Sequence, residues 1–255
     1  MKSISDLKIK VFADGADKRT MLEMLQNPLI KGFTTNPTLM RKAGISDYAT
    51  FARDVLTEIR HHPISFEVFA DDFDEMERQA HQIASWGDNV FVKVPVTNTR
   101  GESALDLISR LTHRGIQLNV TALLPLDQVR DVCSALRKDV PAYISVFAGR
   151  IADTGRDPLP LMTAALEYLR DRELTELIWA SPRELLNIFQ ADAIGCHVIT
   201  VTGDILKKLS LVDKDLHEYS LETVSMFYED ARSSGFSLST QTQLSSEERR
   251  ENVGV

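Results

Sequence analysis

The sequence alternates regularly between short apolar runs and longer segments whose apolar residues recur at helical spacing. Eight runs have the composition of buried strands: residues 8–14, 31–36, 64–69, 89–96, 116–123, 142–149, 176–181 and 196–202. Eight strand–helix units in 255 residues match the size of a (β/α)8 barrel. A doubly wound open sheet is the alternative, but its glycine-rich phosphate loops are absent from the sequence. We therefore predict an α/β protein with a single-domain (β/α)8 TIM-barrel fold.

The segments between these runs predict amphipathic helices. In residues 71–87, for example, the apolar side chains share one helical stripe and a glycine follows as a stop signal. No linker or internal repeat divides the chain, so we assign residues 1–235 to the barrel and a C-terminal helix. Residues 236–255 are polar and largely aperiodic, which predicts a mobile tail.

Composition narrows the possible partners and compartment. The formal net charge of -8 provides no basic field to attract nucleic acid or an anionic membrane, so neither is expected as a partner. Cys133 and Cys196 form no CxxC pair and no disulfide framework, which fits a reducing compartment. The sequence shows no signal peptide and no apolar run long enough to span a bilayer. We expect a cytoplasmic protein.

Successive residues of a strand point to opposite faces of the sheet. In the four central runs, residues 64–69, 89–96, 116–123 and 142–149, the alternate positions therefore form two sets of side chains, one for each face. One parity is aliphatic or aromatic throughout and suits packing under helices. The other parity carries the polar residues Glu67, Lys93, Asn119, Thr121 and Ser145. In a closed barrel this second face points inward. A solvated strand with Lys93 facing water is the opposing interpretation, but it needs an uncovered sheet face that the helices leave no room for.

An interior lysine has a chemistry of its own. Burial disfavours its ammonium form, and the neutral amine attacks carbonyl groups to form Schiff bases. The iminium then acts as an electron sink for carbon–carbon cleavage, which also needs an acid/base at the hydroxyl of the breaking bond. Asp14 and Glu67 are the available carboxylates. Each has a simpler interpretation, because Asp14 could cap a turn and Glu67 could only pair with Lys93.

The segment Ser181–Pro182–Arg183–Glu184 predicts an anion site. It has the S-x-x-E pattern of a capping box with proline at the first helical position, so we expect a helix to begin there. A helix N-terminus beside an arginine attracts anions. The alternative is a plain helix start with a solvated arginine. No histidine or acidic pattern in the sequence supports a metal site, and His197 is interpreted as a packed strand residue.

Five motifs in chain order carry a resemblance to a known family. They are FTTNPT, VKVPVT, LNVTALL, ISVFAGRI and ASPRE. Together they resemble the transaldolase family, which comprises class I Schiff-base enzymes on a (β/α)8 barrel. The resemblance runs from about Val11 to Leu209 and covers most of the chain.

The resemblance implies a role for each matching residue. Lys93 would form the Schiff base, and Asp14 would donate and accept the proton at the cleaved carbinol. Glu67 and Thr121 would hold the water used in imine formation and hydrolysis. The remaining positions would contact substrate: Asn36, Asn119 and Ser145 at the three-carbon unit, Phe147 beside them, and Arg150, Ser181 and Arg183 at the phosphate end.

The implied activity is transfer of a dihydroxyacetone unit between ketose and aldose phosphates, without metal or organic cofactor and in a homo-oligomer. The family's aldolase branch, which releases dihydroxyacetone, tends to have glutamine at Glu67 and tyrosine at Phe147. The family often has phenylalanine at Pro182, so a ketose with another terminal anion, such as a sulfonate, stays open. A non-catalytic sugar-phosphate-binding barrel is disfavoured by the intact set of Asp14, Glu67 and Lys93.

Overall fold

The computed structural model describes residues 3–238. The chain divides into two compact units, Met1–Val212 and Asp213–Val255, which are treated separately below. From residue 239 onward, the predicted polar tail lies outside the described residues.

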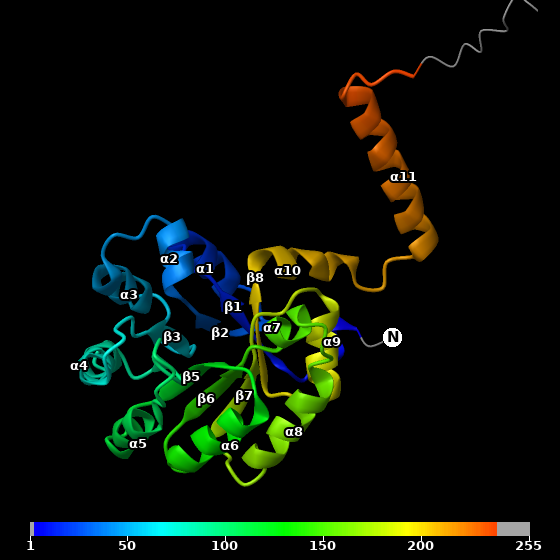
Figure 1. The fold of residues 1–255 in the computed structure, drawn as a ribbon. Coiled ribbons are helices and arrows are strands. Elements are labelled where there is room, and N and C mark those ends of the chain that lie inside the picture. Colours follow the sequence, from blue (N-terminus) through cyan, green and yellow to red (C-terminus); the bar gives the residue numbers. More distant parts are fainter. Residues whose placement is uncertain (1–2, 239–255) are drawn as a thin grey trace, which may run out of the picture. The chain divides into compact units, whose positions relative to one another are not determined.

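The first unit is a closed barrel of parallel strands arranged in chain order (Figure 1). The strands are β1 (Lys10–Asp14), β2 (Ile30–Thr34), β3 (Ile64–Glu67), β4 (Val90–Pro95), β5 (Leu118–Leu123), β6 (Ala142–Val146), β7 (Thr175–Trp179) and β8 (Val198–Thr202). The barrel closes where β1 pairs with β8. Every strand overlaps one of the eight apolar runs found in the sequence. The predicted (β/α)8 TIM barrel is confirmed.

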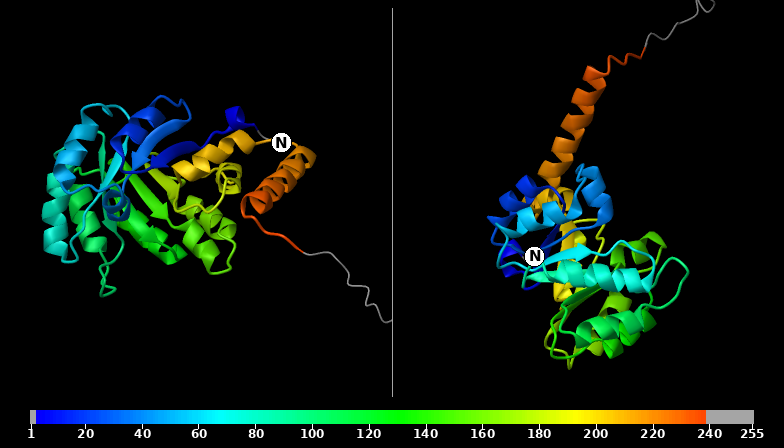
Figure 2. Two further views of the ribbon diagram at one scale, coloured as in Figure 1. Left: turned by 90° about the horizontal axis from the view of Figure 1, so that it is seen from above. Right: turned by 90° about the vertical axis from the view of Figure 1, so that its left-hand side faces the viewer.

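Helices follow the strands and surround them (Figures 1 and 2). They are α1 (Lys18–Leu25), α2 (Pro37–Lys42), α3 (Tyr48–Leu56), α4 (Phe73–Ala84), α5 (Leu105–His113), α6 (Leu126–Ala135), α7 (Ala148–Asp153), α8 (Leu159–Leu169), α9 (Leu186–Ala193) and α10 (Gly203–Lys207). Short 3-10 helices span Ile4–Asp6 and Lys208–Leu211. The side chains of Asp17, Asp47 and Asp72 accept hydrogen bonds from backbone amides in the first turns of α1, α3 and α4.

The second unit contains one described helix, α11 (Leu216–Ser233). The Asp215 carboxylate caps its first turn by accepting from His217 N and Glu218 N, and Lys214 forms an ion pair with Glu222. Within residues 3–238, no helix is both long enough and apolar enough to cross a membrane.

Strand parity divides the buried side chains into two groups. The outward group, which includes Val92 and Ile144, packs beneath the helices in the main core. The inward group forms a separate cluster of Phe12, Phe91, Tyr143, Ile178, Ala180 and Val198. Phe91, Tyr143 and Val198 lie near the amino-terminal ends of their strands and Phe12 in the middle of β1, whereas Ile178 and Ala180 lie at the carboxyl end of β7. The rings of Phe12 and Tyr143 meet edge-on, with centroids 5.4 Å apart. The aromatic rings of Phe12, Phe91 and Tyr143 fill the lower barrel, and the polar residues lie above them at the carboxyl ends of the strands.

The predicted helix start at Ser181 is wrong, because α9 begins only at Leu186. Ser181 instead adopts a left-handed backbone conformation with φ 59°. A Cβ on Gly149 of α7 would lie 1.6 Å from the Ser181 carbonyl oxygen, so the two backbones touch. This close approach fixes a turn at Ser181. In that turn Arg183 N donates a hydrogen bond to the Asn187 side chain, and the predicted capping box does not form.

Gly32 of β2 offers a direct test of the packed lower barrel. A Cβ there would lie 2.6 Å from the Phe12 ring. We expect Gly32→Ala to lower the free energy of unfolding by about 1–3 kcal/mol, because the ring has to leave its packed position. The matched control is Gly15→Ala, where a Cβ meets nothing within 4 Å. Urea unfolding measures both, and equal stability of the two variants would contradict this description of the lower barrel.

Candidate active site

A cavity of about 610 Å³ opens at the carboxyl ends of the strands. All of the site residues predicted from the sequence line it: Asp14, Asn36, Glu67, Lys93, Asn119, Thr121, Ser145, Phe147, Arg150, Ser181 and Arg183. This is the face at which (β/α)8 barrels carry their functional sites. The structure therefore brings the whole predicted set together, although its members are spread over most of the chain.

Lys93 lies inside the barrel, where strand parity placed it, and only 7% of its surface is exposed. Glu67 is its direct neighbour in the register of β3 and β4. The Lys93 Nζ atom lies 3.1 Å from Glu67 Oε2 and donates a hydrogen bond of 3.0 Å to the Thr35 carbonyl oxygen. A buried ammonium thus has a carboxylate and a carbonyl as partners, as its lost hydration requires.

Asp14, at the end of β1, occupies the same cavity. Thr34 Oγ1 donates to Asp14 Oδ1 at 2.8 Å, and Thr34 Oγ1 lies 2.5 Å from Thr200 Oγ1. Because Thr34 gives its proton to Asp14, Thr200 is the donor in the second bond. Burial raises the pKa of Asp14 above its ordinary value, while the Lys93 charge and the Thr34 hydrogen bond oppose that rise.

Amide and hydroxyl groups form the wall between β3 and β6. The Asn119 amide donates to Ser65 Oγ at 3.0 Å, and Ser145 Oγ donates to Asn119 Oδ1 at 2.7 Å. Thr121 Oγ1 is buried in the cavity wall and has no hydrogen-bond partner among the described residues. Such a group needs a water or ligand atom, because an unsatisfied buried hydroxyl is costly.

A bulge in β5 was not predicted. The pairing of β5 with β6 shifts between Val120 and Leu123, and Ala122 has φ 65°. Strand alternation from Leu118 and Val120 predicts that Ala122 points outward, but it is exposed and lines the cavity next to Thr121. A left-handed alanine is strained, and such strain concentrates at functional sites.

Two arginines define one end of the cavity. The Arg150 guanidinium lies 5.4 Å from the Phe147 ring centroid, within range of a cation–π contact. Arg183 donates from Nε to Asp153 Oδ1 at 2.9 Å and from Nη1 to Ser181 Oγ at 2.9 Å. Its Nη2 also contacts Asp153, so the aspartate occupies one edge of the guanidinium fork. Sequence reasoning did not identify Asp153, whose partner is thirty residues away.

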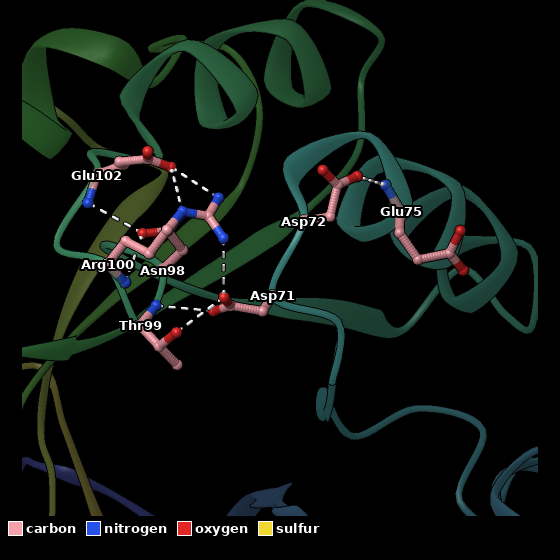
Figure 3. Close-up of polar contacts among 7 residues, drawn as sticks. All are labelled: Asp71, Asp72, Glu75, Asn98, Thr99, Arg100 and Glu102. Atoms are coloured by element: carbon pink, nitrogen blue, oxygen red, sulfur yellow. Dashed lines mark hydrogen bonds and ion pairs between the residues drawn. The ribbon is translucent and has the colours of Figure 1, made fainter.

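The loops that follow Glu67 and Lys93 are tied together at the rim of the barrel (Figure 3). The Asp71 carboxylate accepts from Thr99 N at 2.7 Å and from Thr99 Oγ1 at 2.8 Å. Arg100 bridges Asp71 and Glu102, at 3.4 and 2.9 Å (Figure 3). The β3–α4 and β4–α5 loops therefore hold each other above the two strands that carry the lysine–carboxylate pair.

Strand parity in the four central strands predicts no cavity residues on β2 and β8, the two strands that flank β1. Thr34 on β2, and Thr200 and Thr202 on β8, line the cavity. The same alternation extended to these strands would have found them.

Asn36, which was predicted from the sequence, also accepts a hydrogen bond from Leu39 N at 2.9 Å and caps α2. Within residues 3–238, no group of His, Cys, Asp or Glu is placed to hold a metal ion.

Comparison with known families matches residues 11–249 to the family described as Transaldolase/Fructose-6-phosphate aldolase. A probable transaldolase of Dehalococcoides mccartyi is 32% identical over 202 residues, covering 79% of this chain and 90% of that protein. A probable transaldolase of Chelativorans sp. is 34% identical over 215 residues, covering 83% of this chain and 94% of that protein.

Among solved structures, 3-hexulose-6-phosphate synthase from Salmonella typhimurium is similar with a TM-score of 0.53 and 14% identity. The match covers 78% of this chain and 91% of that one. At this identity the likeness bears on the fold alone.

The raised pKa of Asp14 predicts how stability depends on pH. Folding favours the protonated carboxyl, so ionisation costs stability as pH rises from the ordinary value of about 3.9 through the raised pKa. We expect Asp14→Asn to unfold at a higher urea concentration than wild type at pH 8, and the difference to shrink towards pH 4. Asp171→Asn, at an exposed aspartate, is the control. A difference that grows on acidification would contradict the direction of this shift.

Proposed function

Because the chain belongs to the transaldolase/fructose-6-phosphate aldolase family, we propose that it transfers a dihydroxyacetone unit between sugar phosphates through an imine on Lys93. The observation that carries the proposal is the placement of Lys93. Its amine lies inside the barrel, 3.1 Å from the Glu67 carboxylate, in a cavity that Asp14 also lines. A nucleophilic amine and two carboxylates are the groups that Schiff-base cleavage needs.

Imine formation begins with deprotonation of Lys93. Glu67 is within reach of Nζ and can accept the proton. The neutral amine then attacks the ketose C2 carbonyl, and water leaves from the carbinolamine to give the iminium. The Thr121 hydroxyl, which has no hydrogen-bond partner within residues 3–238, supports this step, because it can hold that water together with Glu67.

Cleavage then takes place at the C3–C4 bond. Asp14 accepts the proton of the C4 hydroxyl, the bond breaks, and its electron pair moves to the iminium to form an enamine on Lys93. The aldose leaves as an aldehyde, and an acceptor aldehyde reverses the sequence. A raised pKa suits Asp14 to this role, because a group that both takes and returns a proton works best with a pKa near the working pH.

The other polar residues support binding of the two halves of the substrate. Asn119 and Ser145 are hydrogen-bonded to each other in the wall of the cavity, where they can hold the hydroxyls of the three-carbon unit. Arg150 and Arg183 lie at the end where a terminal anion would bind. Charge-assisted hydrogen bonds from arginine are the usual means of holding phosphate.

A ketose with a singly charged terminal group is the second candidate substrate. Asp153 occupies one edge of the Arg183 guanidinium, so Arg150, Arg183 and Asp153 carry a net formal charge of one positive unit. A phosphate monoester carries between one and a half and two negative charges near pH 7, whereas a sulfonate carries one. Both substrate types therefore belong in the assay.

The choice between transfer and release of dihydroxyacetone rests on Phe147. Free dihydroxyacetone appears only when the enamine on Lys93 is protonated and water hydrolyses the imine. Phe147 lines the cavity but has no hydroxyl to assist this exit, and Tyr143 belongs to the apolar cluster in the lower barrel. This arrangement supports transfer.

We expect wild-type protein to exchange the three-carbon unit between fructose 6-phosphate and erythrose 4-phosphate while releasing little dihydroxyacetone. Phe147→Tyr combined with Glu67→Gln should raise the released fraction, because the new hydroxyl assists hydrolysis of the imine. Both products are followed by coupled assays, with and without the acceptor. A sulfonated ketose in place of the donor tests the second candidate.

Phe147→Leu is the matched control for this partition, because it changes the side chain without adding a hydroxyl. If wild-type protein releases dihydroxyacetone as fast as it transfers it, the aldolase activity replaces the transferase activity. Absence of turnover with every donor would reject both.

A further inference from the structure

Strand β3 loses its neighbour on one side at the point where it reaches the active site. β2 pairs with β3 only at Phe33↔Ile64 and Thr34↔Ser65. Thr35 N still bonds to Ser65 O, but the chain then turns away into α2. The N–H and C=O groups of alternate strand residues point the same way, so those of Glu67 face this open side, while Val68 N bonds to β4.

One side-chain hydroxyl closes this gap. Tyr48 Oη donates to the Glu67 carbonyl oxygen at 2.8 Å and accepts from Glu67 N at 2.7 Å. A phenol can donate and accept at once. The Tyr48 hydroxyl therefore takes the place of the peptide group that β2 would offer if it continued beside Glu67. Tyr48 begins α3 and is not among the residues that line the active-site cavity.

Neighbouring aromatic rings hold the Tyr48 ring in place. Its centroid lies 6.2 Å from Phe66, 5.7 Å from Trp86 and 5.6 Å from Phe69, the first and last in edge-on geometry. Burial raises the pKa of the Tyr48 hydroxyl, so it stays protonated and keeps its donor. The ring cluster thus fixes the hydroxyl, and the hydroxyl fixes the Glu67 backbone.

We propose that Tyr48 is a positioning residue, which sets the distance between the Glu67 carboxylate and Lys93 by holding the end of β3 from outside the cavity. The inference rests on the proposed function of Glu67. Its physical basis is that a half-buried strand end with an open edge and an unpaired N–H and C=O moves to find other partners. The Glu67 side chain would move with its backbone, away from the lysine.

The test is a double-mutant cycle of Tyr48→Phe and Glu67→Ala, measured as kcat and KM for transfer between fructose 6-phosphate and erythrose 4-phosphate. Loss of two hydrogen bonds to Glu67 should lower kcat about tenfold in Tyr48→Phe, with KM nearly unchanged. The double variant should lose nothing beyond Glu67→Ala, because Tyr48 acts only through Glu67. Tyr168→Phe, which removes the hydroxyl of an exposed tyrosine outside this ring cluster, is the matched control and should retain wild-type kcat within about twofold.

The outcomes separate this inference from the proposed function. If Glu67→Ala lowers kcat and Tyr48→Phe does not, or if their losses multiply in the double variant, the positioning role is overturned and the proposed function stands. If Glu67→Ala keeps wild-type kcat, the role proposed for Glu67 fails, and the positioning role with it. A crystal structure of Tyr48→Phe needs no turnover: we expect Lys93 Nζ and Glu67 Oε2 to separate beyond about 4 Å, and an unchanged contact would overturn the inference.

Discussion

Burying the Lys93 ammonium requires partners that compensate for its lost hydration, and the upper barrel is built around that requirement. Glu67 on the neighbouring strand β3 and the carbonyl of Thr35, the residue after β2, supply two partners. Either partner alone would leave a buried charge poorly satisfied, and removing one side of such a pair costs several kcal/mol, about 3–5 in measured cases. The register that sets Glu67 beside Lys93 is therefore under a strong electrostatic constraint.

The same charge acts on the rest of the cavity. Burial raises the pKa of Asp14, and the Lys93 charge and the Thr34 hydrogen bond oppose this rise. The sequence indicates only that Lys93 is buried, and the structure adds the Glu67 carboxylate 3.1 Å from its Nζ atom. The proposed chemistry uses this carboxylate, because Glu67 can accept the proton of Lys93 when substrate enters.

Sequence reasoning succeeded where local pattern and global fold agree. Strand parity placed Lys93, Glu67 and Asn119 inside the barrel, because a closed sheet covered by helices allows only two environments. It failed where distant backbone contacts override local signals. The capping pattern at Ser181 gives way to contact with Gly149, and the Ala122 bulge has no local signature. Tyr48 and Asp153 act on residues that only the folded chain brings near, so no spacing in the sequence reveals them.

The central claim is that catalysis passes through an imine on Lys93, and oxygen exchange at the ketose carbonyl tests it most directly. Each cycle of imine formation and hydrolysis replaces the C2 oxygen with one from solvent. In water labelled with heavy oxygen, wild-type protein should incorporate label into unreacted ketose, detected by mass spectrometry, and Lys93→Met should fall to the uncatalysed rate. Turnover of the ketose without exchange in the wild type, or exchange that persists in Lys93→Met, would contradict the account.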